Sequence, residues 1–342
     1  TFRLFTYNTR GELVGDIAYL GTSVADTSKP LNGRRHQLAY DNAGNRQWSN
    51  RNGVDALRDD YTANELNQYT KRENNTVPVS GTAALDGGGA GGTAVVVAGG
   101  SLTPVAAGRQ GGRYWNDEIA VANTQNAWRG PLTIFTAKRG TGGSADLYRM
   151  DTRMVEVAGA EQTLGYDADG NLTSDGLVDY TWDAENRLIR METNSGVFSL
   201  GFPHRLIEFR YDYLGRRVQK RVLDADQSPA VEVSSRRFLY DGWSLVAEYA
   251  APGGTTIGAL LRSYTWGLDI ALSMSDAGGV GALLQIADHP SGKTYLPAYD
   301  GNGNIAALLN ADPAGSGPVA AVYEYSPFGE PLRAQTYDAT IT

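Results

Sequence analysis

The chain has 342 residues, of which 41% are hydrophobic, 42 are Gly, 19 are Tyr and none is Cys. The formal net charge of −8 argues against a general nucleic-acid binder, which needs a basic surface, and the lack of Cys excludes disulfides and thiolate metal sites. So much Gly and Tyr favours strands and turns over helices, and no stretch approaches the ~20 apolar residues that a membrane-spanning helix needs.

Residues 1–75 carry a short repeated pattern in which an aromatic residue is followed by Asp or Asn and, three residues later, by Gly. Tyr7 and Gly11 frame the first copy, and Tyr40, Asp41 and Gly44 mark the second. An Asp or Asn side chain at the start of a type I turn accepts a hydrogen bond from the backbone two residues on, and Gly takes the left-handed position that closes the turn with a bulge. Each copy therefore predicts a β-hairpin.

A degenerate third copy lies at residues 61–66. It predicts a turn that is one residue shorter, with Asn64 in the left-handed position.

Residues 76–160 interrupt the pattern and predict a small inserted β-sandwich. Short apolar and β-branched stretches at residues 118–122 and 132–136 are typical of strands. Trp115 and Trp128 lie in this insert, either as core residues or, in the alternative, as rings that stack on a glycan.

A glycine-rich run inside the insert matches the dinucleotide-binding fingerprint by letter at Gly87, Gly89 and Gly92. No convincing strand precedes the run and no helix follows it, so a phosphate would have no helix N-terminus to bind. A flexible loop is the preferred interpretation.

Residues 161–336 resume the hairpin pattern, and residues 337–342 are expected to form a frayed tail. Two stretches without the spaced Gly, residues 240–243 and 266–269, predict tighter turns. The regular copies are Tyr166, Asp167 and Gly170; Trp182 and Asp183 with Asn186 in place of Gly; Tyr211, Asp212 and Gly215; Tyr299, Asp300 and Gly303; and Tyr325 and Gly329.

Six full copies and one variant in a single chain resemble the YD repeats of the bacterial Rhs proteins and the animal teneurins. The resemblance covers roughly residues 1–75 and 160–336, and the stretch from Tyr295 onwards is similar to the start of the Rhs-repeat-associated core. It implies an all-β fold whose hairpins form a spiralling sheet that builds the wall of a hollow shell. Turn spacing alone allows an open solenoid or a barrel as well.

The chain begins inside a repeat, so the sequence predicts a fragment of a longer polypeptide, with the shell completed by that polypeptide or by copies packed edge to edge. The aspartyl self-cleavage site that the resemblance implies would lie beyond Thr342, so no catalytic residue is assigned.

Other site chemistries are less favoured than structural roles for the same residues. The run Asp167, Asp169 and Asn171 resembles the start of a calcium loop, but Gly170 falls at loop position 4 instead of 6. None of His36, His204 and His289 has a second His at metal-ligand spacing. A carboxylate pair for glycoside hydrolysis stays open among the many Asp and Glu residues.

The sequence therefore predicts a non-enzymatic β-shell segment without cofactor or metal, secreted or displayed on a bacterial cell surface. Its expected partner is its own C-terminal toxin domain or another polypeptide guest, held for secretion or contact-dependent competition, with contacts to secretion machinery as a further possibility. The alternative function is a cell-surface adhesion protein that binds carbohydrate through the insert. A polysaccharide-degrading enzyme is the third hypothesis, and no nucleic-acid partner is expected.

Overall fold

The computed structural model describes the chain except residues 52–57, 75, 83–92, 100–104, 107, 111–113, 139, 141–142, 274–275, 313–317, 339–340 and 342. The glycine-rich motif of Gly87, Gly89 and Gly92 lies outside the described residues. The chain divides into two compact units: residues Thr1–Asp179 with Thr193–Phe202, and residues Tyr180–Glu192 with Pro203–Thr342. The expected boundaries after residues 75, 160 and 336 do not coincide with this division and stay predictions.

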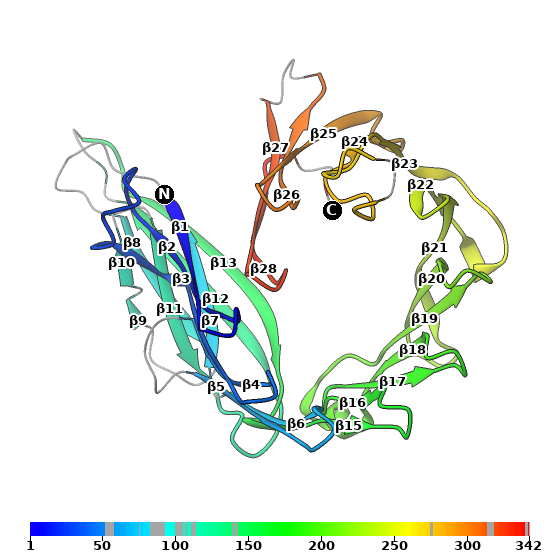
Figure 1. Cartoon of the computed structure of the whole chain (residues 1–342), viewed down its shortest axis with the longest axis horizontal. Coiled ribbons are helices and arrows are strands. Elements are labelled where there is room, and N and C mark those ends of the chain that lie inside the picture. The colour runs from blue at the N-terminus through cyan, green and yellow to red at the C-terminus, as the bar shows by residue number, and fades with distance from the viewer. Residues whose placement is uncertain are drawn as a thin grey trace. The chain divides into compact units, whose positions relative to one another are not determined.

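The first unit opens with a seven-stranded antiparallel sheet in which sequential strands pair with one another (Figure 1). Its order is β1 (Phe2–Tyr7), β2 (Leu13–Tyr19), β3 (Pro30–Tyr40), β4 (Arg46–Asn50), β5 (Asp59–Ala63), β6 (Tyr69–Glu73) and, after the insert, β14 (Glu161–Thr163).

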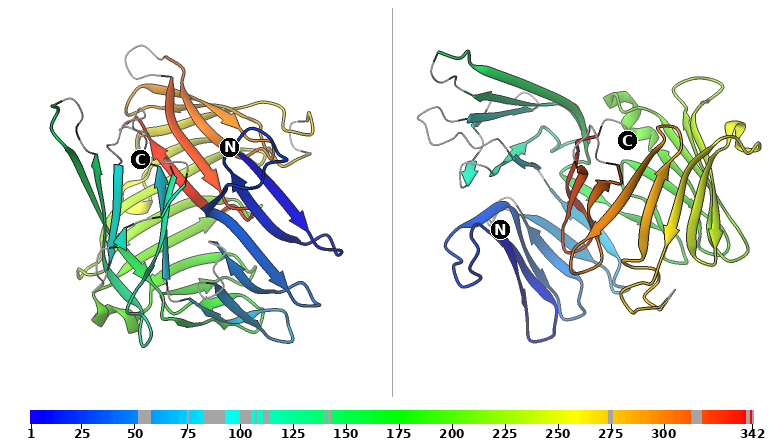
Figure 2. Two further views of the ribbon diagram at one scale, coloured as in Figure 1. Left: turned by 90° about the vertical axis from the view of Figure 1, so that its left-hand side faces the viewer. Right: turned by 90° about the horizontal axis from the view of Figure 1, so that it is seen from above.

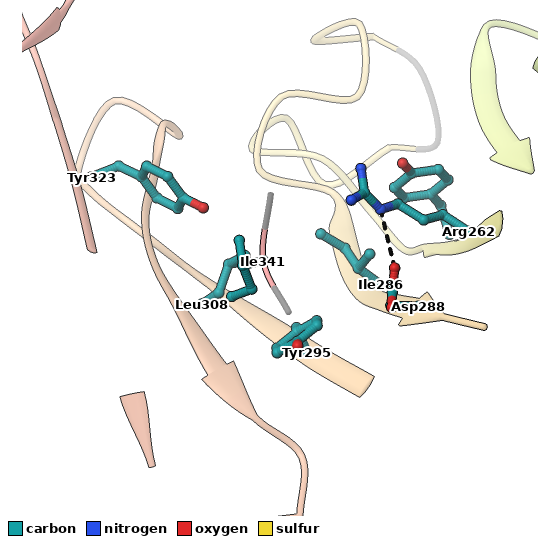
Figure 3. A pocket seen from close by; sticks show the side chains of 8 residues that line it. Arg262, Ile286, Asp288, Tyr295, Leu308, Tyr323 and Ile341 are labelled. Carbon is teal, nitrogen blue, oxygen red and sulfur yellow. Dashed lines mark hydrogen bonds and ion pairs between the residues drawn. The ribbon is translucent and has the colours of Figure 1, made fainter. Parts of the chain in front are cut away.

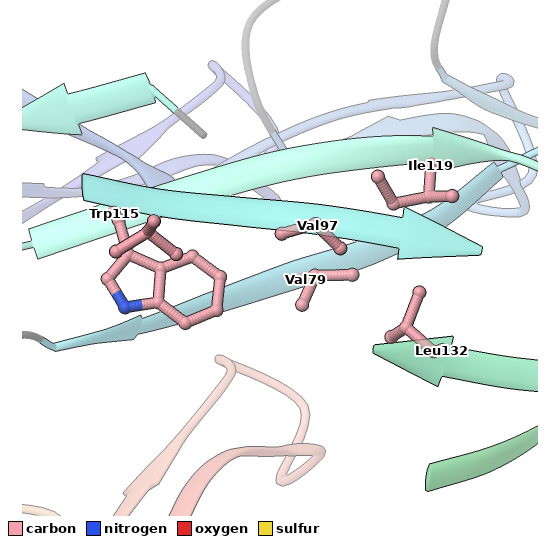
Figure 4. Packing of buried hydrophobic residues seen from close by; sticks show 6 residues of the cluster. Val79, Val97, Trp115, Ile119 and Leu132 are labelled. Atoms are coloured by element: carbon pink, nitrogen blue, oxygen red, sulfur yellow. The ribbon is translucent and has the colours of Figure 1, made fainter. Parts of the chain in front are cut away.

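The insert forms two further sheets in the same unit. One has the order β10 (Gly108–Gln110), β11 (Tyr114–Ala120), β7 (Thr76–Thr82), and the other the order β13 (Leu147–Val157), β12 (Trp128–Lys138), β8 (Thr93–Gly99), β9 (Val105–Ala106). Val79, Trp115 and Ile119 from the first sheet pack against Val95, Val97 and Leu132 from the second (Figure 4). This buried apolar layer between two sheets is the core of a β-sandwich.

The insert leaves and rejoins the repeat sheet at adjacent points. The Asn74 N–H donates to the Ala160 carbonyl at 2.9 Å. The side-chain amide of Asn123, which is fully buried, donates to the carbonyls of Asn74 at 3.0 Å and Ala158 at 2.9 Å. The Asn123 side chain and the backbone bond from Asn74 to Ala160 therefore hold the entry and the exit of the insert together.

A second antiparallel meander begins in the first unit with β15 (Gly165–Tyr166) and β16 (Leu172–Ser174), and β17 (Val178–Trp182) spans the border between the units. A 3-10 helix, η2 (Ser195–Leu200), completes the first unit. In the second unit the strands follow one another along a curved path (Figures 1 and 2). They are β18 (Leu188–Thr193), β19 (Arg205–Tyr211), β20 (Arg217–Asp224), β21 (Val231–Asp241), β22 (Ser244–Ala250), β23 (Leu260–Trp266), β24 (Leu283–Asp288), β25 (Lys293–Tyr299), β26 (Ile305–Asn310), β27 (Val319–Tyr325) and β28 (Pro331–Thr336), with the short 3-10 helix η3 (Pro252–Gly254) after β22.

The expected all-β fold, with tandem hairpins and an inserted β-sandwich, is confirmed. The turns have the geometry that the repeat pattern predicts. The repeat glycines have φ between +79° and +91°, and Asn186 has φ +57°. Each donates its N–H to the carbonyl of the first turn residue, as from Gly215 to Asp212 at 3.1 Å, and the strand register shifts at the preceding aromatic residue, as between Arg210 and Tyr211.

Two turn predictions are wrong. In the degenerate third copy, Asn64 occupies the first turn position and Asn67 takes the left-handed one at φ +61°, so the turn has the full length. The reason is that Ala63, not Tyr61, ends the strand.

No tight turn follows Trp266, because the next strand, β24, begins only at Leu283. Between the two strands, Asp269 begins a repeat-type turn with Leu272 in the left-handed position at φ +59°. Leu272 stands where the repeat pattern has Gly, so the pattern does not predict this turn. The other predicted tight turn is confirmed, because Asp241 pairs with Ser244 across the two residues Gly242 and Trp243.

Candidate functional site

The turn aspartates organise each hairpin through both carboxylate oxygens. Oδ1 of Asp167 accepts the N–H groups of Asp169 at 3.0 Å and Asn171 at 2.8 Å, and Oδ2 accepts the Asn171 side-chain amide at 3.0 Å. The Asn171 side-chain bond, together with the backbone N–H groups, holds the pKa of Asp167 below its usual value. Both carboxylate oxygens of Asp167 are therefore engaged in the turn itself.

The residue after the left-handed position links one repeat to the next, and sequence reasoning missed it. Arg187 binds its own Asp183 through Nε at 2.8 Å, donates from Nη1 to the Asp212 carbonyl at 3.3 Å, and lies over the Tyr211 ring at 5.5 Å. Arg216 repeats the arrangement on its own turn, its guanidinium donating to the Gly242 carbonyl and lying 5.3 Å from the Tyr240 ring. The recurrence of Arg directly after the left-handed residue in both copies could have indicated this role from the sequence.

Five aromatic residues of the repeats donate a side-chain hydrogen bond to a backbone carbonyl earlier in the chain. The Tyr211 hydroxyl donates to the Leu188 carbonyl at 2.7 Å, and the Tyr240 hydroxyl to the Arg217 carbonyl at 3.0 Å. The same contact joins Tyr166 to Tyr69, Trp266 to Leu245 through the indole N–H, and Tyr299 to Leu283. We call these contacts the tyrosine links. A Trp can replace Tyr at this position because the indole N–H also donates.

The predicted repeat residues are thus distributed along the sheets and do not converge on one centre. Tyr7 is 61% exposed. Tyr40, Tyr325 and Trp182 are half-buried at strand ends. The turn members Gly11, Asp41, Gly44, Gly170, Asp183, Asp300, Gly303 and Gly329 hold backbone geometry.

The glycan-contact hypothesis is wrong for Trp115. Only 6% of this residue is exposed, and it packs in the core of the sandwich, so neither ring face is open to a sugar (Figure 4). Trp128 is half-buried on β12, and its role as a glycan contact stays a hypothesis.

The three histidines lie in separate places. His36 on β3 is buried, and burial beside Arg51, Arg3 and Arg46 lowers its pKa to about 4. His204 lies 2.9 Å from a Glu192 oxygen, and His289 lies 2.9 Å from the Ser263 hydroxyl. Within the described residues, no group of three or more His, Asp or Glu side chains is placed to hold a metal ion.

A pocket of about 200 Å³ lies in the second unit, on one face of the strands β23 to β27 (Figure 3). Its walls are aromatic and aliphatic with one ion pair. The lining residues are Arg262, Tyr264, Ile286, Asp288, Tyr295, Leu308, Tyr323 and Ile341. Strands β23, β24 and β25 share this face because Tyr264 stands opposite Ile286 and Ile286 opposite Tyr295.

Charges around the pocket are compensated. Nε of Arg262 donates to Asp288 at 3.4 Å, and the Tyr264 hydroxyl donates to the buried Glu248 at 2.5 Å. Burial, together with this hydrogen bond, raises the pKa of Tyr264. The Tyr323 hydroxyl points toward the pocket in Figure 3. The pocket therefore suits an apolar or aromatic group with one polar atom near Arg262 or Tyr323.

Comparison with known proteins gives two kinds of match. No family model matches the chain. The chain is 26% identical over 223 residues to the tRNA3(Ser)-specific nuclease WapA of Bacillus spizizenii and to the tRNA nuclease WapA of Bacillus subtilis, which are Rhs-family proteins. The resemblance to the Rhs/YD-repeat proteins is confirmed. These matches include 65% of this chain but only 8% of each relative's length.

Solved structures similar to this YD-repeat chain include TcdB2-TccC3-Cdc42 and TcdB2-TccC3, at 13% and 12% identity. Each match covers 99% of this chain and 15% of the solved chain, with a TM-score of 0.36.

The expectation that the protein is not an enzyme is corrected by these relatives, because WapA proteins are named tRNA nucleases and nucleases are enzymes.

The described residues include no helix long and apolar enough to cross a membrane.

Proposed function

We propose that the chain forms part of a wall that encloses a polypeptide guest within a longer, Rhs-type bacterial toxin that is secreted or displayed at the cell surface. The observation that carries the proposal is the set of tyrosine links, five of which join a hairpin to a strand earlier in the chain and so suit a continuous, closed sheet. A sheet that encloses a guest must resist opening between hairpins, and hydroxyl–carbonyl bonds across the hairpins supply that resistance.

The pocket of the second unit supports the same proposal. A guest held by many weak contacts needs apolar surface with scattered polar groups, and the pocket offers Ile286, Leu308 and the Tyr323 hydroxyl in one place. The activity of the whole protein is proposed to be RNA cleavage, after the names of the WapA relatives.

The test is protease protection of the guest in the full-length protein that contains this chain. We expect the guest to survive protease in the wild type and to be degraded in a triple variant Tyr211→Phe, Tyr240→Phe, Tyr299→Phe, which lacks three tyrosine links. The matched control is Tyr7→Phe with Tyr213→Phe, since these rings are 61% and 89% exposed. A guest digested as fast in the wild type as in isolation would contradict enclosure.

The enzymatic part is tested on the same material. Full-length protein is incubated with purified tRNA after the guest has been released by denaturation and refolding. Cleavage that follows the guest and not the repeat chain supports the proposal, and no cleavage by any portion of the protein contradicts it.

A further inference from the structure

Strand β13 (Leu147–Val157) is an edge strand with an open side. It pairs with β12 along its whole length, from Lys138 opposite Leu147 to Trp128 opposite Val157. It stands at the end of its sheet, and no other strand of the described chain pairs with it. Most of its residues are exposed. Such an edge presents a row of backbone N–H and C=O groups to any strand that fits it.

The sequence of β13 is complementary to itself in one antiparallel register. With Thr152 placed opposite Thr152 of a second copy, Asp151 stands opposite Arg153 and Arg153 opposite Asp151. On the other face, Met150 stands opposite Met154 in both directions. Opposite residues of an antiparallel pair are close enough for such charge pairs and apolar pairs to stabilise it.

Neighbouring registers are disfavoured by charge. A centre at Arg153 places two Arg153 side chains opposite each other, and a centre at Asp151 places two Asp151 side chains opposite each other. Like charges directly opposite destabilise a strand pair. Shifts by one residue would join the inner face of one sheet to the outer face of the other. The centre at Thr152 is therefore selected over these neighbours.

In the single chain, the charged and apolar side chains of β13 are largely exposed to solvent. Asp151 and Arg153 pair along the strand at 3.3 Å, with exposed side-chain fractions of 42% and 75%, and a solvent-exposed pair of this kind contributes little. Met150 and Met154 are 70% and 51% exposed on a strand that also carries the exposed Tyr148. A second copy would cover the methionines and give each charge a cross-strand partner.

We propose that β13 is a self-association edge, through which the four-stranded sheets of two copies of this chain join into one continuous sheet about a twofold axis at Thr152. The partner is a second copy of this chain. When its β13 runs antiparallel, the order Asp151, Thr152, Arg153 is reversed, and each charge then faces one of opposite sign.

Charge reversal tests the proposal by sedimentation across a range of protein concentrations. We expect the wild type to shift from monomer to dimer, and Asp151→Arg and Arg153→Asp each to weaken self-association at least about tenfold, because each places like charges opposite each other twice. Mixing the two variants in equal amounts should restore a dimer, since every facing pair is then of opposite sign. Glu185→Arg, on an exposed turn of the other unit, is the matched control.

Restoration on mixing also shows that the single variants are folded. A wild type that stays monomeric at every soluble concentration overturns the proposal. So does a dimer that both single variants leave unchanged, because the contact would then lie elsewhere on the chain.

Discussion

Tyr211 shows what the aromatic residue contributes to each repeat. Its ring lies under the Arg187 guanidinium and its hydroxyl donates to the Leu188 carbonyl at 2.7 Å. The neighbouring Tyr213 is 89% exposed and makes no such link. Removing the hydroxyl from each of these two tyrosines in turn therefore tests the hydrogen bond across hairpins.

Tyr211→Phe should lower the free energy of unfolding by about 1 kcal/mol, the usual net value of one hydrogen bond, because the Leu188 carbonyl loses its donor while the ring contacts stay. Urea denaturation measures the change. Tyr213→Phe should leave the free energy of unfolding unchanged, and equal losses in both variants would contradict the role of the tyrosine link.

His36 should make the first unit sensitive to mild acid. Its pKa is lowered from 6.5 to about 4 by burial and nearby Arg side chains. Between pH 6.5 and 4, His36 is therefore protonated in the unfolded chain and neutral in the folded chain. Stability from this residue is complete above pH 6.5 and is lost as the pH falls to about 4, by up to about 3 kcal/mol.

Thermal unfolding of the wild type and of His36→Gln at several pH values checks this. The difference in stability between the two proteins should change between pH 6.5 and 4 and be constant above it. A constant difference over the whole range would show that His36 titrates normally in the folded chain.

At the scale of elements, one buried side chain helps to tie the insert to the repeat sheet. Asn123 is the donor that joins the carbonyls of Asn74 and Ala158, so the two ends of the insert are tied at the repeat sheet. Asn123→Ala should lower the free energy of unfolding by about 2 kcal/mol, because it leaves two carbonyls without their donor.

The measurement is denaturant unfolding followed by tryptophan fluorescence, to which the core residue Trp115 contributes as one of six Trp residues. Asn126→Ala is the matched control, since Asn126 is exposed three residues further on. A loss in the control as large as that in Asn123→Ala would assign the effect to the loop and not to the buried amide.

The hairpins themselves could be predicted from the sequence, but their connections could not. The spacing from Asp to Gly places a left-handed residue by local chemistry alone, as at Asp167 and Gly170. The turn from Asp269 to Ser273 escaped prediction because Leu272 occupies a conformation that its side chain disfavours. The contacts of Arg187 and the pocket escaped because they join residues of different hairpins, and sequence spacing does not report such distances.

At the scale of the whole molecule, each strand of the repeat sheets pairs only with its neighbours, and the chain divides into two compact units. Substitutions in different units should therefore act independently. We expect the losses of Asn123→Ala and Tyr211→Phe to add in the double variant within about 0.5 kcal/mol.

Calorimetry of the two single variants and the double variant measures this. Two transitions, of which Asn123→Ala lowers one and Tyr211→Phe the other, are the expected pattern. A single transition would show that the units unfold as one cooperative body, and a double variant whose loss differs clearly from the sum would show that the two sites are coupled.

The direction of the tyrosine links also bears on how the protein is made. Every one of them runs from a later hairpin to a carbonyl earlier in the chain, from Tyr166 back to Tyr69 and from Tyr299 back to Leu283. A ribosome releases the earlier partner first, at about 5–20 residues per second. A newly synthesised hairpin that forms a tyrosine link thus finds its acceptor already made, and the sheet can grow during translation without waiting for later residues.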